Sequence, residues 1–230
     1  MVECYAIIAG GGASQRFGQD LPKPFVPVNG VPMIIYSIES FMRLSIPVHV
    51  IIPSDHEDRW LAIAQQYHLS DVTYSFGQPT RYLSVQTALK NAPPSRYVLI
   101  HDAARPLFSP DSVQDILQAL TTHPACILGA PVVDTLKKCT DGLVSATVPR
   151  EDTFHAQTPM GFDRSQLTNL MAQNNDHTLT DESQLFEHHD QPIHVISSHH
   201  PNFKITYPDD LALAEYLITT YREPGPLIRL

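Results

Sequence analysis

The spacing of apolar and polar positions changes repeatedly along the chain and predicts strands alternating with helices. Short continuous apolar runs, typical of buried strands, occupy residues 3–9, 47–52, 72–75, 97–100, 125–133 and 193–197. Apolar residues recur at helical spacing in residues 32–44, 55–67, 80–91, 110–121, 163–173, 181–188 and 208–221. Helical crossovers join parallel strands, so we expect an α/β fold with a mostly parallel sheet and helices on both faces.

Local signals mark where two of these helices begin. Ser109 followed by Pro110 is typical of a helix N-terminus, since serine caps free N–H groups and proline suits the first turn. Asp55 is expected to cap the helix at 55–67. Neither a repeat nor a linker-like segment divides the chain, so we expect one domain over residues 1–230. Residues 223–230 contain two prolines and a glycine and are expected to be loosely held.

The alternation breaks after residue 133, where a β-hairpin is predicted. Asp141-Gly142 lies between β-favouring flanks in residues 137–148, and Asp-Gly is a frequent two-residue hairpin turn. The flanks show no apolar face that would join a core. Inserted hairpins of this kind often serve as oligomerisation arms, and residues 137–150 are expected to form such an arm. A surface flap is the alternative.

Composition and charge narrow the classes of function. Apolar residues make up 43% and charged residues 17% of the chain, as in ordinary globular proteins, and no apolar stretch is long enough to cross a bilayer. The first residues lack the basic segment of a signal peptide, so we expect a cytoplasmic protein without a membrane partner. A formal net charge of −9 argues against nucleic acid as a partner, so any bound anion needs a local cluster of cations.

The cysteines do not predict a disulfide framework or a zinc site. Cys4, Cys126 and Cys139 are an odd number without a Cys-x-x-Cys spacing. Cys4 and Cys126 lie in apolar runs and are expected to be core residues.

A glycine-rich loop after the first predicted strand is the first candidate site. Gly10, Gly11 and Gly12 bring backbone N–H groups close to an anion because no Cβ stands in the way. Arg16 offers phosphate oxygens a fork of N–H groups, and Lys23 adds a compact charge. The spacing matches neither a dinucleotide-binding Gly-x-Gly-x-x-Gly nor a P-loop, which disfavours those two classes. A tight turn with two surface cations is the alternative.

The second candidate segment lies where a central strand is expected to end. Asp102, Ala103 and Arg105 follow the strand at 97–100, and the carboxyl ends of strands line the ligand crevice of an open parallel sheet. An acid, small residues and an arginine suit close approach to a phosphate or a hydroxyl. A strand-ending turn with a surface ion pair is the alternative.

The third candidate segment, residues 77–85, joins a predicted strand to a predicted helix. Gly77 closes the strand and the helix is expected to begin by Arg81, which places Ser84 in its first two turns, over the crevice. Helix starts are rich in such residues, so a purely structural role is a strong alternative.

Taken together and in order, these segments resemble one enzyme family. It comprises the cytidylyltransferases that make 4-diphosphocytidyl-2-C-methylerythritol from CTP and 2-C-methyl-D-erythritol 4-phosphate, in the non-mevalonate route to isoprenoids. The similarity runs from about residue 4 to residue 216 and is carried by residues 101–106, 130–137, 180–183 and 202–206 with 208–211. The resemblance implies a Rossmann-like sheet and a homodimer joined by an exchanged arm. It also implies Mg²⁺, or another divalent cation, held mainly by the triphosphate with Asp102 nearby.

The resemblance further implies roles for individual residues. The catalytic cations match Arg16, Lys23 and Lys204, of which the first two would bind the triphosphate and its transition state. Nucleotide-side contacts fall on Gly10, Gly11, Gly12, Gly77, Gln78, Ser84 and Ala103. Acceptor contacts fall on Asp102, Ala103, Arg105, Thr180 and Lys204, and contacts from a partner subunit on Arg150 and Thr158.

The implied chemistry needs positioned charge rather than an acid or a base. An acceptor phosphate is already an anion when it attacks the α-phosphorus, so catalysis is positioning plus neutralisation of charge. The chain departs from the family at Gln78-Pro79, where a second glycine and a polar residue are usual, and Pro79 has no N–H to offer the base. Another polyol phosphate, such as ribitol 5-phosphate, is the alternative acceptor. A non-catalytic nucleotide-binding module is disfavoured because the cations are all present.

Overall fold

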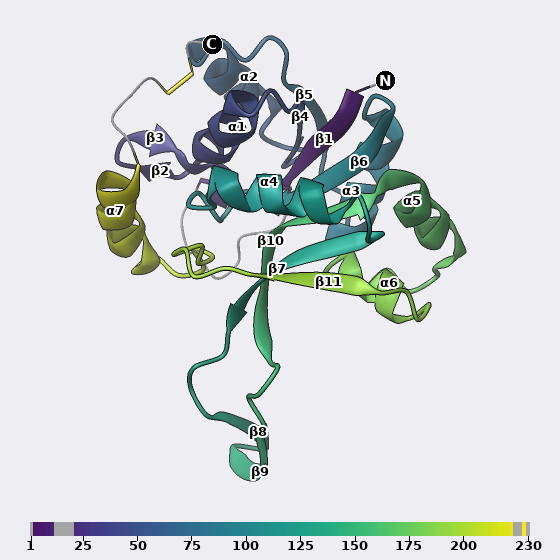
Figure 1. Ribbon diagram of the computed structural model, residues 1–230. Helices are drawn as coiled ribbons and strands as arrows, with labels where there is room; N and C mark the ends of the chain where they lie inside the picture. The colour runs from purple at the N-terminus through teal and green to yellow at the C-terminus, as the bar shows by residue number, and fades with distance from the viewer. Residues whose placement is uncertain (1, 12–20, 223–226, 229–230) are drawn as a thin grey trace.

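The computed structural model describes residues 2–11, 21–222 and 227–228, and a seven-stranded sheet lies at its centre (Figure 1). The strands follow one another across the sheet in the order β11-β7-β10-β6-β1-β4-β5. Their bounds are β1 (Val2–Ala9), β4 (Val48–Ile52), β5 (Thr73–Phe76), β6 (Ser95–Asp102), β7 (Ala125–Pro131), β10 (Phe154–Asp163) and β11 (Ile193–Ser197). The predicted α/β fold with a mostly parallel sheet is confirmed.

Strand β10 lies inside this sheet, between β7 and β6, and the sequence pattern does not predict it. It runs antiparallel to β6 and β7, whereas the other neighbouring pairs are parallel. Pro159 and Gly161 interrupt its apolar pattern, and its first three residues are exposed. The pairing with β7 shifts register between Gln157 and Met160, so the proline falls within an irregularity that needs no N–H from it.

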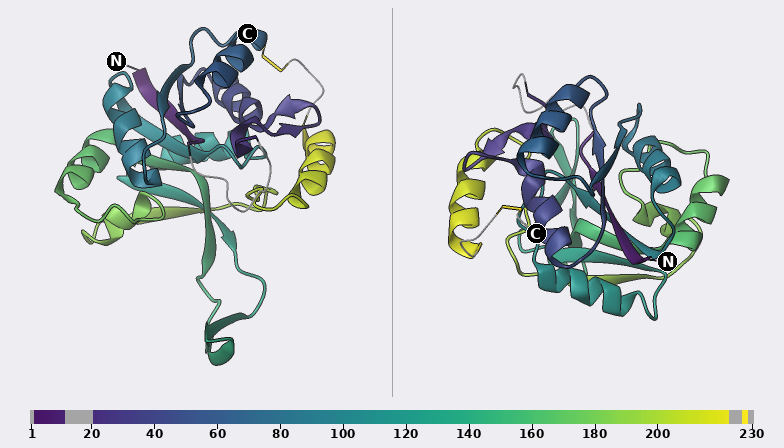
Figure 2. Two further views of the ribbon diagram at one scale, coloured as in Figure 1. Left: turned by 180° about the vertical axis from the view of Figure 1, so that it is seen from behind. Right: turned by 90° about the horizontal axis from the view of Figure 1, so that it is seen from above.

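Helices cover both faces of the sheet (Figure 2). One face carries α1 (Met33–Arg43), α2 (Glu57–Gln66) and α4 (Pro110–Ala119), and the other carries α3 (Arg81–Asn91), α5 (Arg164–Gln173) and α6 (Ser183–Glu187). Alternate residues of β1 contribute to the two cores, as the two-residue period of a strand requires. No helix in the described part of the chain is long and apolar enough to span a membrane.

One predicted helix cap is confirmed and the other is wrong. Ser109 Oγ accepts a hydrogen bond from Asp111 N at 3.2 Å, at the start of α4. Asp55 does not cap α2: the residue at the cap position is His56, and its side chain makes no capping hydrogen bond to a described residue.

The cysteines all lie in the described part of the chain and are free. Cys4 and Cys126 are buried, as expected for core residues, and burial raises the pKa of both thiols to about 12. These two thiols therefore stay protonated and unreactive at neutral pH. Cys139 is exposed on the hairpin.

The predicted hairpin is present, with β8 (Leu136–Thr140) and β9 (Leu143–Val148) joined by Asp141-Gly142. Both turn residues have positive φ, 51° and 80°, as a tight two-residue hairpin turn requires. The hairpin extends away from the body in front and back views (Figures 1 and 2). Every residue of β9 is exposed, including Leu143 at 76% and Val144 at 63%, so the predicted lack of a core face is confirmed.

A side cluster joins α7 (Asp210–Tyr221) to a small hairpin of β2 (Pro27–Val28) and β3 (Val31–Pro32), beside the short helix η1 (Lys23–Phe25). Part of the C-terminal segment also packs on the body. Ile228 is 3% exposed, and its N–H donates to Glu39 Oε1 at 3.3 Å. The expectation of a loosely held tail therefore does not hold for residues 227–228, while residues 223–226 and 229–230 lie outside the described residues.

Candidate active site

The carboxyl ends of β1, β4, β5 and β6 are tied together at one edge of the sheet. Gly10 N donates to a carbonyl of β4 at 3.0 Å, and Gly77 N donates to the next carbonyl of that strand at 2.8 Å. Ala103 N donates to Ala9 O at 3.1 Å, which joins β6 to β1. The segments around Gly10, Gly77 and Ala103, which were expected to line one crevice, therefore lie side by side. Because these N–H groups bind the protein's own carbonyls, the expectation that Gly10 N faces an anion is corrected.

The loops after β1 and β5 cross in direct backbone contact. A Cβ on Gly11 would lie 2.7 Å from Gly77 Cα, and a Cβ on Gly77 would lie 2.7 Å from Gly11 O. Non-bonded heavy atoms do not approach this closely without a shift of the backbone. Both positions therefore need glycine, and the two loops expected to contact the nucleotide hold each other in place.

We expect Gly77→Ala to move the loop away from Gly11 and to weaken nucleotide binding. Overpacking of this kind costs about 1–3 kcal/mol in the free energy of unfolding. Urea unfolding and calorimetric titration with CTP measure the two effects. Gly142→Ala is the control: it has φ 80°, no described atom within 4 Å of the added Cβ, and a position on the hairpin. The Gly142→Ala substitution should lower the free energy of unfolding, because alanine is strained at this positive φ, and should leave the affinity for CTP unchanged. Wild-type CTP affinity in Gly77→Ala would show that this crossing does not shape the nucleotide site.

Ser84 connects the third candidate segment to the helix that follows it. Thr80 Oγ1 accepts from Leu83 N at 3.2 Å and caps α3. Ser84 Oγ donates to Thr80 O at 2.8 Å and accepts from Gln78 N at 2.8 Å. Ser84 is 5% exposed, so in this structure its hydroxyl holds the loop, whereas the Gln78 side chain is exposed.

Asp102, the last residue of β6, is the centre of a charged cluster. Its Oδ2 accepts a hydrogen bond from Lys204 Nζ at 2.7 Å and lies 3.9 Å from Arg105 Nε. Its Oδ1 accepts from Arg81 Nη2 at 3.3 Å. Burial alone would raise the pKa of Asp102, but the three cations outweigh burial and hold this pKa well below its usual range. The carboxylate is therefore ionised at neutral pH. The expected grouping of Asp102, Arg105 and Lys204 is present.

Arg81 and Glu182 extend this cluster, although neither was predicted as a site residue. Arg81 Nη1 donates to Glu182 Oε1 at 2.6 Å. Glu182 is 1% exposed, and its Oε2 has no hydrogen-bond partner among the described residues. Burial raises the pKa of Glu182, and the Arg81 charge opposes that rise. Both residues stand in segments that the sequence singled out, but nothing in the sequence shows that they meet.

Thr158 lies on β10 directly beside Asp102. Its Oγ1 accepts from Asp102 N at 3.0 Å, and Thr158 O accepts from Asn202 Nδ2 at 2.8 Å. Asn202 O in turn accepts from Arg105 Nη1 at 2.8 Å. Thr158 is 4% exposed, and its polar atoms orient Asp102 and Arg105 in its own chain, while its contact with a partner subunit stays a prediction.

His101 is buried behind this cluster and remains neutral. Burial lowers the pKa of His101 to about 3, against the opposing charge of Asp102. Its Nε2 lies 3.0 Å from Arg105 O and therefore donates, which leaves Nδ1 to accept from Thr158 Oγ1 at 3.1 Å. We interpret His101 as support for the strand end.

The two lysines predicted to be catalytic are linked through one short segment. Lys23 Nζ donates to Ile205 O at 3.0 Å, and Ile205 directly follows Lys204. The Lys204 side chain is 46% exposed, so its ammonium can meet a ligand. Gly12 and Arg16 lie outside the described residues.

Two expected acceptor contacts stand at the rim. Thr180 is exposed, lies two residues before Glu182, and accepts from Gln184 Nε2 at 2.8 Å. Arg150 is exposed at the base of the hairpin, where its guanidinium donates to Val133 O. Arg150 thus contacts Val133, on the segment that leads into the hairpin of its own chain, and its contact with a partner stays a prediction.

The described acidic residues suit a metal ion only when a bound ligand supplies most of the oxygen atoms that coordinate it. Across the described ranges, no three His, Cys, Asp or Glu side chains come close enough to form a metal site. Asp102 and Glu182 are both paired with cations. Mg²⁺ commonly keeps several waters and takes phosphate oxygens as ligands, so these residues fit an ion held by a triphosphate with Asp102 nearby.

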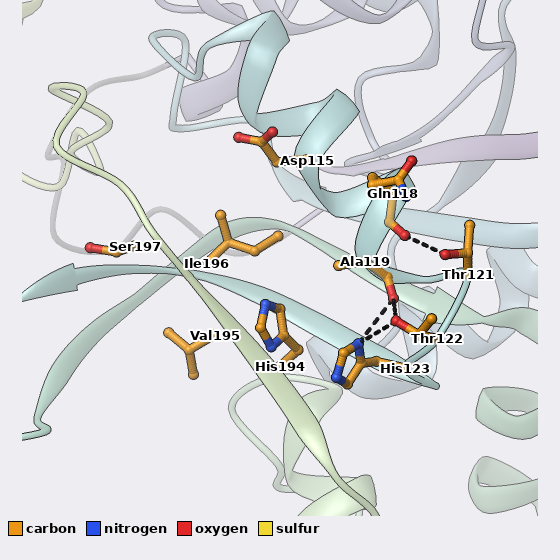
Figure 3. A pocket seen from close by; sticks show the side chains of 10 residues that line it. All are labelled: Asp115, Gln118, Ala119, Thr121, Thr122, His123, His194, Val195, Ile196 and Ser197. Atoms are coloured by element: carbon orange, nitrogen blue, oxygen red, sulfur yellow. Dashed lines mark hydrogen bonds between the residues drawn. The ribbon is translucent and has the colours of Figure 1, made fainter.

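A groove of about 490 Å³ lies elsewhere, between α4 and β11 (Figure 3). His123 and His194 stack in it with ring centroids 4.5 Å apart. The groove contains none of the predicted site residues. The candidate site is therefore defined by the charged cluster at the strand ends.

Known proteins match nearly the whole chain. Residues 4–220 match the family described as "IspD: 2-C-methyl-D-erythritol 4-phosphate cytidylyltransferase". The chain is 33% identical to the protein of that enzyme name from Bacillus mycoides (strain KBAB4), over 91% of this chain and 95% of that protein. The crystal structure of 4-diphosphocytidyl-2C-methyl-D-erythritol synthase from Anaerococcus prevotii has a TM-score of 0.80 and 28% identity, covering 95% of this chain and 96% of that one.

Longer relatives match as well. The chain is 34% identical, over 97% of its length, to the bifunctional enzyme IspD/IspF of Desulfotalea psychrophila. It spans 55–59% of the length of the bifunctional relatives that it matches. The match from residue 4 to residue 220, together with the fold, shows that this chain belongs to the 2-C-methyl-D-erythritol 4-phosphate cytidylyltransferase family.

Proposed function

We propose that the chain transfers CMP from CTP to 2-C-methyl-D-erythritol 4-phosphate, giving 4-diphosphocytidyl-2-C-methyl-D-erythritol and pyrophosphate. The observation that carries the proposal is the Asp102 cluster, which places Lys204 and Arg105 at the strand ends of a chain of this family. The product belongs to the non-mevalonate route to isoprenoids.

The proposed reaction is a displacement at the α-phosphorus of CTP. An oxygen of the acceptor phosphate forms the new bond, and the bond to pyrophosphate breaks. Arg16 and Lys23 would bind the triphosphate, and Lys204 would bind the acceptor phosphate. Mg²⁺, when bound by the triphosphate, would neutralise part of its charge. Since the attacking phosphate is already anionic, these groups contribute by positioning and by electrostatic stabilisation.

Asp102 suits the binding of the acceptor rather than proton transfer. Its depressed pKa keeps it ionised, so it is an acceptor of hydrogen bonds at every pH near neutrality. The acceptor carries hydroxyl groups that donate to such a carboxylate. The Lys204 ammonium lies 2.7 Å from the same carboxylate. Asp102 would therefore bind the hydroxyl groups of the acceptor while the neighbouring Lys204 binds its phosphate.

We further propose that two subunits exchange the hairpin arm, residues 137–150, and that Arg150 binds the partner's acceptor phosphate. Support comes from the exposed apolar residues Leu143 and Val144, which a second copy would cover. A C₂ arrangement makes two equivalent composite sites. The free, exposed Cys139 suits a reducing compartment, and we propose the cytoplasm.

Pyrophosphate release tests the reaction. We expect release that requires CTP, 2-C-methyl-D-erythritol 4-phosphate and Mg²⁺ together. The panel should include ribitol 5-phosphate and other polyol phosphates at equal concentration. Faster turnover with ribitol 5-phosphate would move the assignment to that acceptor. CTP binding without turnover on any acceptor would identify a non-catalytic nucleotide-binding module.

A further inference from the structure

The first turn of α3 holds the loop at residues 174–182 by two separate contacts. Arg81 Nη1 donates to Glu182 Oε1 at 2.6 Å, at the end of this loop. Tyr82 stacks on His177 with ring centroids 5.4 Å apart and an angle of 19° between the planes. The loop also carries Thr180. The position of an expected acceptor contact is thus set by residues that begin the helix after the nucleotide loop.

Arg81 joins this loop to the strand end through both of its terminal nitrogens. Nη1 binds Glu182, and Nη2 binds Asp102 Oδ1 at 3.3 Å. Both carboxylates are buried, at 1% and 8% exposure. A planar guanidinium fixes two carboxylates at a set separation, whereas a lysine ammonium is a single point of charge without that geometry.

We propose that Arg81 is a positioning residue for the acceptor: it holds Asp102 and the loop at 174–182 in the one arrangement that the acceptor needs. This inference rests on the proposed function. Arg81 acts through the two carboxylates, and Asp102 Oδ2 stays directed to Lys204 because Oδ1 is held by Arg81. Its removal should therefore affect the acceptor and leave CTP binding nearly unchanged.

Arg81→Lys tests the proposal, with Arg164→Lys as the matched control. Arg164, the first residue of α5, is also a partly buried arginine that contacts α3. Its Nη2 donates to Leu89 O at 2.7 Å and to Ala92 O at 2.8 Å, at the end of α3 that lies far from Arg81. Arg81→Lys should raise the KM for the acceptor about 10–100-fold, as expected when a charged hydrogen bond is lost. The KM for CTP should stay within about twofold. The Arg164 variant should change neither KM. A similar rise in both KM values of Arg81→Lys would overturn the proposal.

Glu182→Gln examines the same contact from its other side. If the two residues act through one bridge, their effects on acceptor KM are not additive, and the double variant should resemble the poorer single variant. Full additivity of the two effects would show that they act separately and would contradict the proposal.

Hydrogen exchange separates this inference from the proposed reaction. In Arg81→Lys, the amides of residues 174–182 should exchange about tenfold or more faster than in the wild-type chain. Arg164→Lys should leave that loop unchanged. Wild-type exchange of the loop in Arg81→Lys would overturn the positioning role whatever the substrate is. Failure of the wild-type chain to turn over the acceptor would instead count against the proposed function alone.

Discussion

Lys204→Ala is expected to lower kcat by about 10²–10³-fold while CTP binds with nearly unchanged affinity. Lys204 Nζ lies 2.7 Å from Asp102 at the strand ends, where the proposed transfer develops charge. An interaction that strengthens only in the transition state changes kcat rather than ground-state binding. We expect Lys23→Ala likewise to lower kcat far more than it weakens CTP binding, because the proposed role of Lys23 at the triphosphate is to neutralise charge that grows in the transition state.

Steady-state kinetics and calorimetric titration with CTP measure the two quantities. Lys90→Ala is the matched control, since Lys90 is an exposed lysine in the last turn of α3. It should keep kcat and CTP affinity within about twofold, as surface substitutions do. A loss of CTP affinity as large as the loss of rate would show that Lys23 and Lys204 are ordinary ground-state ligands.

Mixed dimers of Lys23→Ala and Arg150→Ala chains are expected to regain roughly a quarter of wild-type activity, although each parent is nearly inactive. If Arg150 acts in the partner's site, a mixed dimer has one site with both lesions and one site with neither. Random reassociation of equal amounts makes about half of the dimers mixed, so about one site in four is intact. The exposed position of Arg150 at the base of the hairpin leaves it accessible to a second copy.

The mixing experiment needs proof that subunits exchange, which co-purification of differently tagged chains provides. Each variant incubated alone must stay inactive. With exchange demonstrated, activity no higher than the average of the parents would place Arg150 within its own subunit's site or outside any site. The shared active site would then be wrong.

The sequence by itself determined the class of fold, since the switch between continuous apolar runs and helical spacing depends only on local order. In the described part of the chain, all seven α-helices and six of the seven strands of the central sheet follow from that pattern. The Asp-Gly turn of the arm is likewise a local property, because glycine tolerates the positive φ of 80°. The order of short segments along the chain also indicates the family, and the match over residues 4–220 confirms it.

Strand β10 was decided only by the tertiary structure. Its proline and glycine break the local pattern, and the strand is stabilised by pairing with β6 and β7 on both sides. The role of Thr158 depends on that pairing, because the antiparallel register places its hydroxyl against Asp102 N. Local propensity carries no information about which distant strand supplies the partner.

The charged cluster was likewise decided by contacts between distant parts of the chain. The sequence indicates Asp102, Arg105 and Lys204 as separate candidate residues, but it does not indicate Arg81, the arginine that joins Asp102 to Glu182. Arg81 and Glu182 are 101 positions apart, and each is unremarkable in its own segment. Their pairing follows from burial, because a carboxylate at 1% exposure is stable only beside a cation, and the fold alone determines which cation is within reach.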